Sequence, residues 1–84
     1  MGTIQAVPGF DRLTVEPGKM GGQPCIRGYR FTAEHLVELH VNGWTDEQII
    51  AEYPFIEPED IQQALRFALS LMQREFYLPM AESA

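Results

Sequence analysis

The spacing of apolar residues divides the chain into two parts. Before Phe31 the apolar residues stand in short runs broken by glycine and proline. From Thr32 onward they recur every three or four residues, which is the period of an amphipathic helix. The pattern predicts an N-terminal arm and strand-forming part over residues 1–31, a helical part over residues 32–78 and a tail over residues 79–84.

Two short runs in the first part have the composition of strands. Residues 13–15 and 25–27, with a brief continuation over residues 29–31, are rich in β-branched and aromatic side chains. Turn-forming glycines and prolines separate them into pieces too short for a helix. Pro24 has no backbone N–H, so the second run should lie at a sheet edge or begin a strand. We expect a short β-hairpin.

The first two predicted helices have recognisable ends. The first covers residues 33–41, with Thr32 as its N-cap and Gly43 near its C-terminal end. The second covers residues 46–53, where Thr45 and Gln48 match a capping box. Pro54 then stops it, because proline disfavours a helical residue before it.

The third predicted helix is the longest and covers residues 58–77. Pro58 is allowed in a first turn, and Glu59 and Asp60 are favourable at the positive end of the helix dipole. One apolar stripe is predicted to face the core; its members are Ile61, Ala64, Leu65, Ala68, Leu69, Met72 and Phe76. At about 1.5 Å per residue, such a helix is longer than a core of this size needs.

The tight connection over residues 53–57 is typical of a helix-turn-helix. The predicted fold is therefore mainly α: a short N-terminal β-hairpin followed by a three-helix, helix-turn-helix bundle. With 84 residues the chain has room for one core, so we expect a single domain over residues 1–84.

Charge follows the same division. Residues 1–30 hold four basic and two acidic residues, a net charge of +2, whereas residues 31–84 hold two basic and ten acidic residues, a net charge of −8. Such asymmetry suggests two faces with different partners. A single cysteine, Cys25, excludes an internal disulfide and suggests a reducing compartment. We expect a cytoplasmic protein without a targeting signal or a membrane span.

No residue pattern indicates an enzyme, a cofactor or a metal. Cys25 has no activating neighbours and is better explained as a small apolar strand residue than as a nucleophile. His35 and His40 would lie about 140° apart around a helix and cannot face one metal ion. Glu34 and Glu38 do share a face, but a solvated acidic face explains them better than a cation site does.

The basic residues of the first part are candidates for DNA contact. Arginines on a β-ribbon can clamp phosphates or enter a groove; the candidates are Arg12, Lys19, Arg27 and Arg30. For Arg30 an internal pair with an acid of the helical part is an equal alternative, and for Arg27 we favour DNA or a partner.

The third helix offers less for DNA. Its start carries Glu57, Glu59 and Asp60, which repel phosphates at close range. Farther along, Gln62, Gln63 and Arg66 could reach base edges, because glutamine pairs with adenine and arginine with guanine. Ordinary exposed surface is the alternative for all three.

An apolar stretch near the C-terminus suggests a protein interface, because exposed apolar patches commonly mark binding surfaces. Its candidate partner-binding residues are Met72, Phe76, Tyr77, Leu78 and Met80. The alternative is that this stretch folds back on its own core.

Two motifs carry a family resemblance. Residues 22–30, GQPCIRGYR, and residues 43–54, GWTDEQIIAEYP, together resemble the domain-of-unknown-function family 433, which looks like VapB-type antitoxins. The resemblance spans roughly residues 13 to 69. It implies a hairpin-preceded, homeodomain-like helix-turn-helix and a neighbouring PIN-like nuclease toxin. Gln23 stands where lysine is usual, which weakens a phosphate role for that loop.

The resulting hypothesis is an antitoxin of a type II toxin-antitoxin system. In it a homodimer grips and blocks a PIN-like ribonuclease, and the complex represses its own operon by binding operator DNA. Two alternatives stay open: a DNA-binding regulator without a toxin, and a structural or adaptor subunit of a larger assembly. An acidic partner suits a toxin that binds RNA, because such a toxin carries a basic groove.

Overall fold

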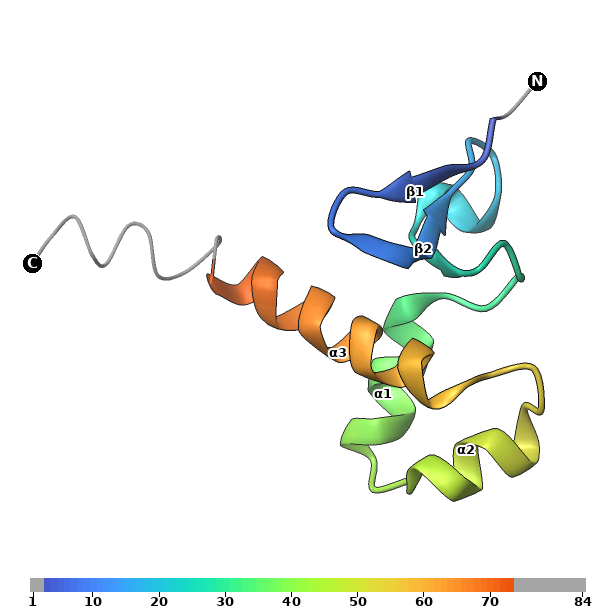
Figure 1. Ribbon diagram of the computed structural model, residues 1–84, viewed down its shortest axis with the longest axis vertical. Coiled ribbons are helices and arrows are strands. Elements are labelled where there is room, and N and C mark those ends of the chain that lie inside the picture. Colours follow the sequence, from blue (N-terminus) through green and yellow to red (C-terminus); the bar gives the residue numbers. More distant parts are fainter. Residues whose placement is uncertain (1–2, 74–84) are drawn as a thin grey trace, which may run out of the picture.

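The computed structural model describes residues 3–73. A small sheet lies at one end of the molecule and three helices at the other (Figure 1). The elements in chain order are β1 (Gln5–Val7), β2 (Phe10–Val15), the 3-10 turn η1 (Met20–Gly22), β3 (Cys25–Ile26), α1 (Ala33–Val41), α2 (Asp46–Glu52) and α3 (Pro58–Met72). The fold is a small α+β arrangement rather than the mainly α fold predicted.

The sheet has three antiparallel strands in the order β1-β2-β3. The predicted hairpin corresponds to β2 and β3, whose register pairs Leu13 with Ile26. Strand β1 was not predicted. Its turn to β2 is made by Pro8 and Gly9, and Gly9 takes a positive φ of 85°, which glycine adopts without a steric penalty.

Residues 29–31 do not form the predicted continuation strand. After Ile26 the chain turns sharply, and the Ile26 N–H donates to the Phe31 carbonyl over 2.9 Å. A single bridge between Cys25 and Thr32 completes the return. One more backbone bond, from the Ala33 N–H to the Pro24 carbonyl over 2.9 Å, leads directly into α1, which begins at Ala33.

The helix ends follow the predicted caps. Helix α1 has the predicted bounds, and the Thr32 hydroxyl accepts from the His35 N–H over 3.0 Å. The capping box before α2 is formed, with Thr45 and Gln48 each accepting the other's backbone N–H. Helix α3 is described to Met72, and the predicted end at Tyr77 lies outside the described residues.

Sheet and helices share one core. Its buried members come from β2, β3, all three helices and the loops between them; those that are almost fully buried are Leu13, Ile26, Leu36, Ile49, Ile56, Ile61 and Ala64. The change of pattern near Phe31 therefore separates two kinds of secondary structure but not two cores. None of the helices within residues 3–73 is long and apolar enough to cross a membrane.

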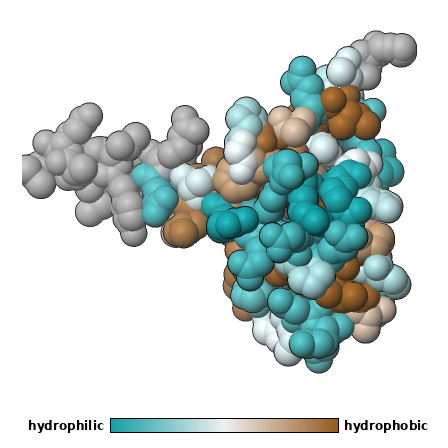
Figure 2. Space-filling view, in the orientation of Figure 1, coloured by the Kyte–Doolittle hydropathy of each residue, from teal (hydrophilic) through white to brown (hydrophobic). Residues whose placement is uncertain are grey.

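The predicted apolar stripe of α3 holds only in its first half. Ile61 and Ala64 are buried, whereas Leu69 and Met72 are exposed. The second half of α3 projects beyond the other helices (Figure 1). In the space-filling view, apolar residues reach the surface beside this projecting end (Figure 2). The helix is longer than the core beneath it, as its predicted length implied.

Candidate functional site

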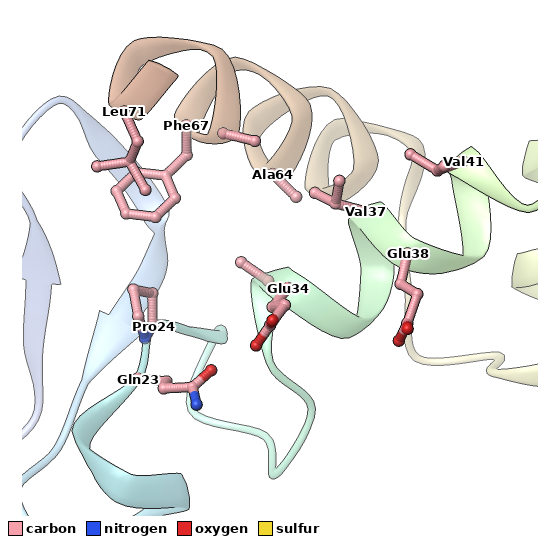
Figure 3. Close-up of a pocket in the computed structure, with 11 residues that line it drawn as sticks. Gln23, Pro24, Glu34, Val37, Glu38, Val41, Ala64, Phe67 and Leu71 are labelled. Atoms are coloured by element: carbon pink, nitrogen blue, oxygen red, sulfur yellow. The ribbon is translucent and has the colours of Figure 1, made fainter. Parts of the chain in front are cut away.

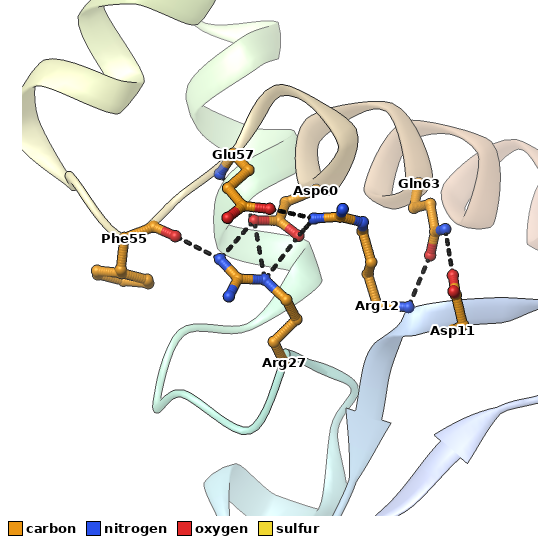
Figure 4. Close-up of polar contacts among 7 residues, drawn as sticks. All are labelled: Asp11, Arg12, Arg27, Phe55, Glu57, Asp60 and Gln63. Atoms are coloured by element: carbon orange, nitrogen blue, oxygen red, sulfur yellow. Dashed lines mark hydrogen bonds and ion pairs between the residues drawn. The ribbon is translucent and has the colours of Figure 1, made fainter.

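A buried carboxylate joins the sheet to the start of α3. Asp60 is 0% exposed and lies between two arginines of the sheet region. Arg27 donates from Nη2 to Asp60 Oδ2 over 2.9 Å and from Nε to Oδ1 over 3.1 Å. Arg12 donates from Nη1 to Oδ1 over 3.2 Å (Figure 4). We call Arg12, Arg27, Glu57 and Asp60 the Asp60 cluster.

Local backbone geometry aims Arg27 at Asp60. Arg27 and Gly28 both have positive φ, 42° and 80°, and the Tyr29 N–H closes the turn on the Ile26 carbonyl over 2.8 Å. This is the geometry of a tight hairpin turn, which glycine favours at its second central position. Arg27 Nη2 also donates to the Phe55 carbonyl.

An aromatic pair covers the same turn. The Tyr29 ring stacks on Phe55 with centroids 4.4 Å apart, and the Arg27 guanidinium lies 5.4 Å from the Tyr29 ring centroid. Stacked rings and a cation over a ring face are both favourable arrangements. These contacts hold the loop before α3 against the hairpin.

Three further contacts extend the junction. Arg12 Nη1 pairs with Glu57 Oε1 over 2.6 Å. The Gln63 side chain accepts from the Arg12 backbone N–H over 2.9 Å and donates to Asp11 Oδ1 over 2.6 Å. Because Gln63 is also buried, its amide fixes the distance between β2 and α3. Within residues 3–73 no buried side-chain polar atom lacks a hydrogen-bond partner.

The cluster keeps Asp60 ionised. Burial raises the pKa of its carboxyl, but hydrogen bonds from Arg27, from the Glu57 N–H and from Arg12 outweigh burial and lower the pKa below its ordinary value. Reciprocally, hydrogen bonds to Glu57 and Asp60 raise the pKa of Arg12, and the hydrogen bond to Asp60 raises that of Arg27. All charges are matched within the cluster, so the arrangement is a structural junction.

Several predicted DNA-contacting residues are used in this junction. Arg12 and Arg27 face Asp60, and Gln63 is buried against β2. For Arg27 the structure has the internal ion pair that the sequence left as the less favoured alternative. Lys19 donates to the Gly28 carbonyl and lies 3.6 Å from a Glu16 carboxylate oxygen.

The other DNA candidates lie at the surface. Arg30 is exposed in the turn before α1, and Gln62 and Arg66 are exposed one turn apart on α3. Their DNA role stays a prediction. Within the described residues no three His, Cys, Asp or Glu side chains are grouped to hold a metal ion.

The second notable feature is an open apolar groove between α1 and α3, with a volume of about 490 Å³. Its apolar walls come from both helices and from the loop before β3; we define the α1–α3 groove by Val37, Val41, Ala64, Phe67, Ala68 and Leu71, with Pro24 at one end. Val41 is 74% exposed and Leu71 43%. Figure 3 shows Phe67 and Leu71 near Pro24, and Val41 at the far end of α1.

Acidic residues mark one edge of the groove. Glu34 and Glu38 are exposed, lie one turn apart on α1 and line the groove. Their carboxylates point away from α3 (Figure 3). The groove thus combines an apolar floor with a negative edge.

The predicted interface residues overlap this region only in part. Met72 is 57% exposed at the end of α3, while Phe76, Tyr77, Leu78 and Met80 lie outside the described residues. The sequence prediction missed Phe67, which falls off the predicted stripe; Leu71 began the apolar C-terminal stretch but was not among the candidate partner-binding residues. The spacing of Phe67 and Leu71, four residues and one turn apart on α3, was the available signal.

Comparison with known proteins gives one family and one solved structure. The model of the family described as "Protein of unknown function (DUF433)" matches residues 13–68. The chain is similar to the crystal structure of a DUF433 member protein from Anabaena variabilis ATCC 29413, with 25% identity and a TM-score of 0.63. The similarity covers 86% of this chain and 66% of that chain, so this chain spans just under two thirds of its structural relative. No curated protein matches the chain.

Proposed function

This chain belongs to the DUF433 family, and from that premise we propose that it is an antitoxin-like protein-binding module. Its α1–α3 groove binds a partner protein, a PIN-like ribonuclease toxin, and blocks it. The observation that carries the proposal is the exposed apolar groove itself. Apolar side chains such as Val41 and Leu71 remain in contact with water there, and a partner that covers them gains about 25 cal/mol per Å² of apolar area.

The charge distribution supports the same partner. The chain has a net charge of −6, and Glu34 and Glu38 lie beside the groove. A nuclease that binds RNA carries basic residues around its substrate path, so an acidic binder associates with it faster and is selected over neutral competitors. In this proposal the protein acts in the cytoplasm, as a homodimer with a homeodomain-like helix-turn-helix.

The proposal is tested by capture of the product of the adjoining gene in co-expressing cells. The variant Ala68→Arg places a long cation on the groove wall, and Ala51→Arg makes the same chemical change at an exposed position of α2. We expect Ala68→Arg to weaken capture and protection at least tenfold and Ala51→Arg to keep both. Folding of each variant is checked by circular dichroism. Full capture by a folded Ala68→Arg protein would contradict the proposal.

A second candidate function, operator binding, is supported by one observation: Gln62 and Arg66 are both exposed one turn apart on α3. Such a pair could reach adjacent base edges. This candidate predicts duplex binding that weakens steeply with salt and is reduced by Arg66→Ala together with Arg30→Ala. An absence of duplex binding at low salt would exclude it for the isolated protein.

A further inference from the structure

The walls of the α1–α3 groove restrict what kind of segment can occupy it. The two long walls are helices, whose interior backbone N–H and C=O groups already bond within the helix. At the end formed by the loop before β3, the Pro24 carbonyl already accepts from the Ala33 N–H over 2.9 Å, and proline has no N–H to offer. A β-strand would find no free sheet edge there with which to pair its backbone. An occupant must therefore satisfy its own backbone hydrogen bonds, and a helix is the structure that does so.

The length of α1 sets the length of the contact. Nine residues from Ala33 to Val41 rise about 13 Å, so an occupant lying along the groove is covered over two to three turns. Its apolar residues should recur every three to four positions to meet Val37, Val41 and Leu71 along the groove.

The edge of the groove adds a requirement of charge. Glu34 and Glu38 are spaced four residues apart, about 6 Å along the axis of α1. Two cations spaced four residues apart on a helical occupant have the same axial separation. No basic residue is among the described residues that line the groove.

We propose that the groove accepts an amphipathic helix of the partner whose apolar stripe is flanked by Lys or Arg four residues apart, facing Glu34 and Glu38. This inference rests on the proposed function and names the element of the partner that the groove recognises. A second copy of this chain is a poorer occupant, because each copy carries a net charge of −6 and brings the same two glutamates to the contact.

The inference is tested by fluorescence anisotropy with three labelled peptides and the full chain. All three share one apolar stripe over roughly 12–15 residues, long enough for helix formation. They differ only at the two flanking positions, which hold Lys, Gln or Glu. We expect the Lys peptide to bind about tenfold more tightly than the Glu peptide at low salt, and this preference to shrink as salt rises.

Charge reversal on the protein distinguishes an effect of Glu34 and Glu38 themselves from an effect of the net charge of the chain. The double variant Glu34→Lys and Glu38→Lys should reverse the preference in favour of the Glu peptide. A matched control, Glu47→Lys with Glu52→Lys, changes the net charge equally on exposed positions of α2 and should keep the preference for Lys. Equal changes in both double variants would overturn the inference, since the selectivity would then come from net charge.

The remaining outcomes are also decisive. Failure of all three peptides to bind, or equal affinity for all three, overturns the inference. If the peptides bind the full-length double variant Phe76→Ser with Leu78→Ser but not the wild-type chain, the occupant of the groove is the chain's own C-terminal segment. If the chain self-associates and Ala68→Arg abolishes that association, the occupant of the groove is a second copy of this chain. The proposed function has its own test: it is wrong if Ala68→Arg leaves capture of the natural partner intact, regardless of the affinities measured for the three peptides.

Discussion

The two halves of α3 differ in how far the rest of the molecule buries them. Residues 58–64 lie against the sheet, where Asp60 and Gln63 are buried and hydrogen-bonded and Ile61 and Ala64 belong to the core. Residues 65–72 carry Leu69, Leu71 and Met72, all of which are exposed. The buried polar contacts thus lie in the first half of α3, whereas these three apolar side chains of the second half stay exposed, although Phe67 beside them packs edge-on against Phe10 of β2.

This difference suggests that different residues determine the stability of the fold and the proposed binding of a partner. The Asp60 cluster and Gln63 connect the sheet to the first half of α3, so substitutions there should affect unfolding. The exposed members of the α1–α3 groove, Val41 and Leu71, lie outside this junction, so substitutions there should affect partner binding with little cost to the fold. Four measurements, ordered by the size of the expected effect, test whether the two properties are separate.

The largest effect is expected for Asp60→Asn. This change keeps the size of the side chain but removes the charge that faces Arg12 and Arg27, leaving both cations without their buried partner. Loss of one member of a buried ion pair costs about 3 kcal/mol in the free energy of unfolding. Urea denaturation measures it. The control Glu59→Gln, an exposed acid in the same turn, should change stability by less than about 0.5 kcal/mol.

Acid should remove the contribution that ionised Asp60 makes to the free energy of unfolding. The pKa of Asp60 in the folded protein lies below its ordinary value of 3.8. Its contribution is therefore complete above pH 3.8 and is lost as the pH falls through the lower, folded-state pKa. The difference in unfolding free energy between wild type and Asp60→Asn should shrink over that range. A difference that stays constant down to acid unfolding would show that Asp60 contributes through shape alone.

A smaller loss is expected for Arg27→Gln. Asp60 then keeps Arg12 and the Glu57 N–H as partners, so we expect about 1–2 kcal/mol, the size of a charged hydrogen bond. Arg30→Gln is the matched control, because Arg30 is exposed three residues farther along the same loop. Thermal unfolding of the two variants gives the comparison. Equal stability of the two would remove Arg27 from the structural junction and return it to the DNA candidates.

The smallest effect is expected for Val41→Ser in the groove. Val41 is 74% exposed, so the free energy of unfolding should change by less than about 0.5 kcal/mol. Binding of an apolar partner helix should nevertheless weaken. Leu36→Ala on the same helix is the contrasting variant, and it should cost about 2–5 kcal/mol because Leu36 is fully buried. A large destabilisation by Val41→Ser would mean that the groove belongs to the closed core.

Local signals in the sequence were sufficient for the helices. Thr32, Thr45 and Pro58 act within one turn of the helix that each begins, so the starts of α1, α2 and α3 could be predicted from neighbouring residues alone. The resemblance to family 433 is confirmed, because the family model matches residues 13–68. The antitoxin role stays a prediction.

Contacts between distant segments could not be predicted in the same way. Strand β1 is short and depends on pairing with β2, and Arg12 meets Asp60 across 48 positions of sequence. The sequence showed four basic residues in the first part, but which acids they pair with depends on the tertiary fold. The groove was missed because local spacing does not show which apolar residues of α3 stay uncovered: Phe67 packs against Phe10 of β2, whereas Leu71 remains exposed.

The separation of Arg12 from Asp60 has a consequence for the rates of folding. The caps of α1 and α2 close over three residues and can form early, whereas the Asp60 cluster must bring together segments separated by 45 and 48 positions. Contacts of that kind are expected to form after the main barrier. Substitutions in the cluster should then accelerate unfolding while leaving the refolding rate nearly unchanged. The lifetime of the native state would thus depend on a contact that contributes little to reaching it.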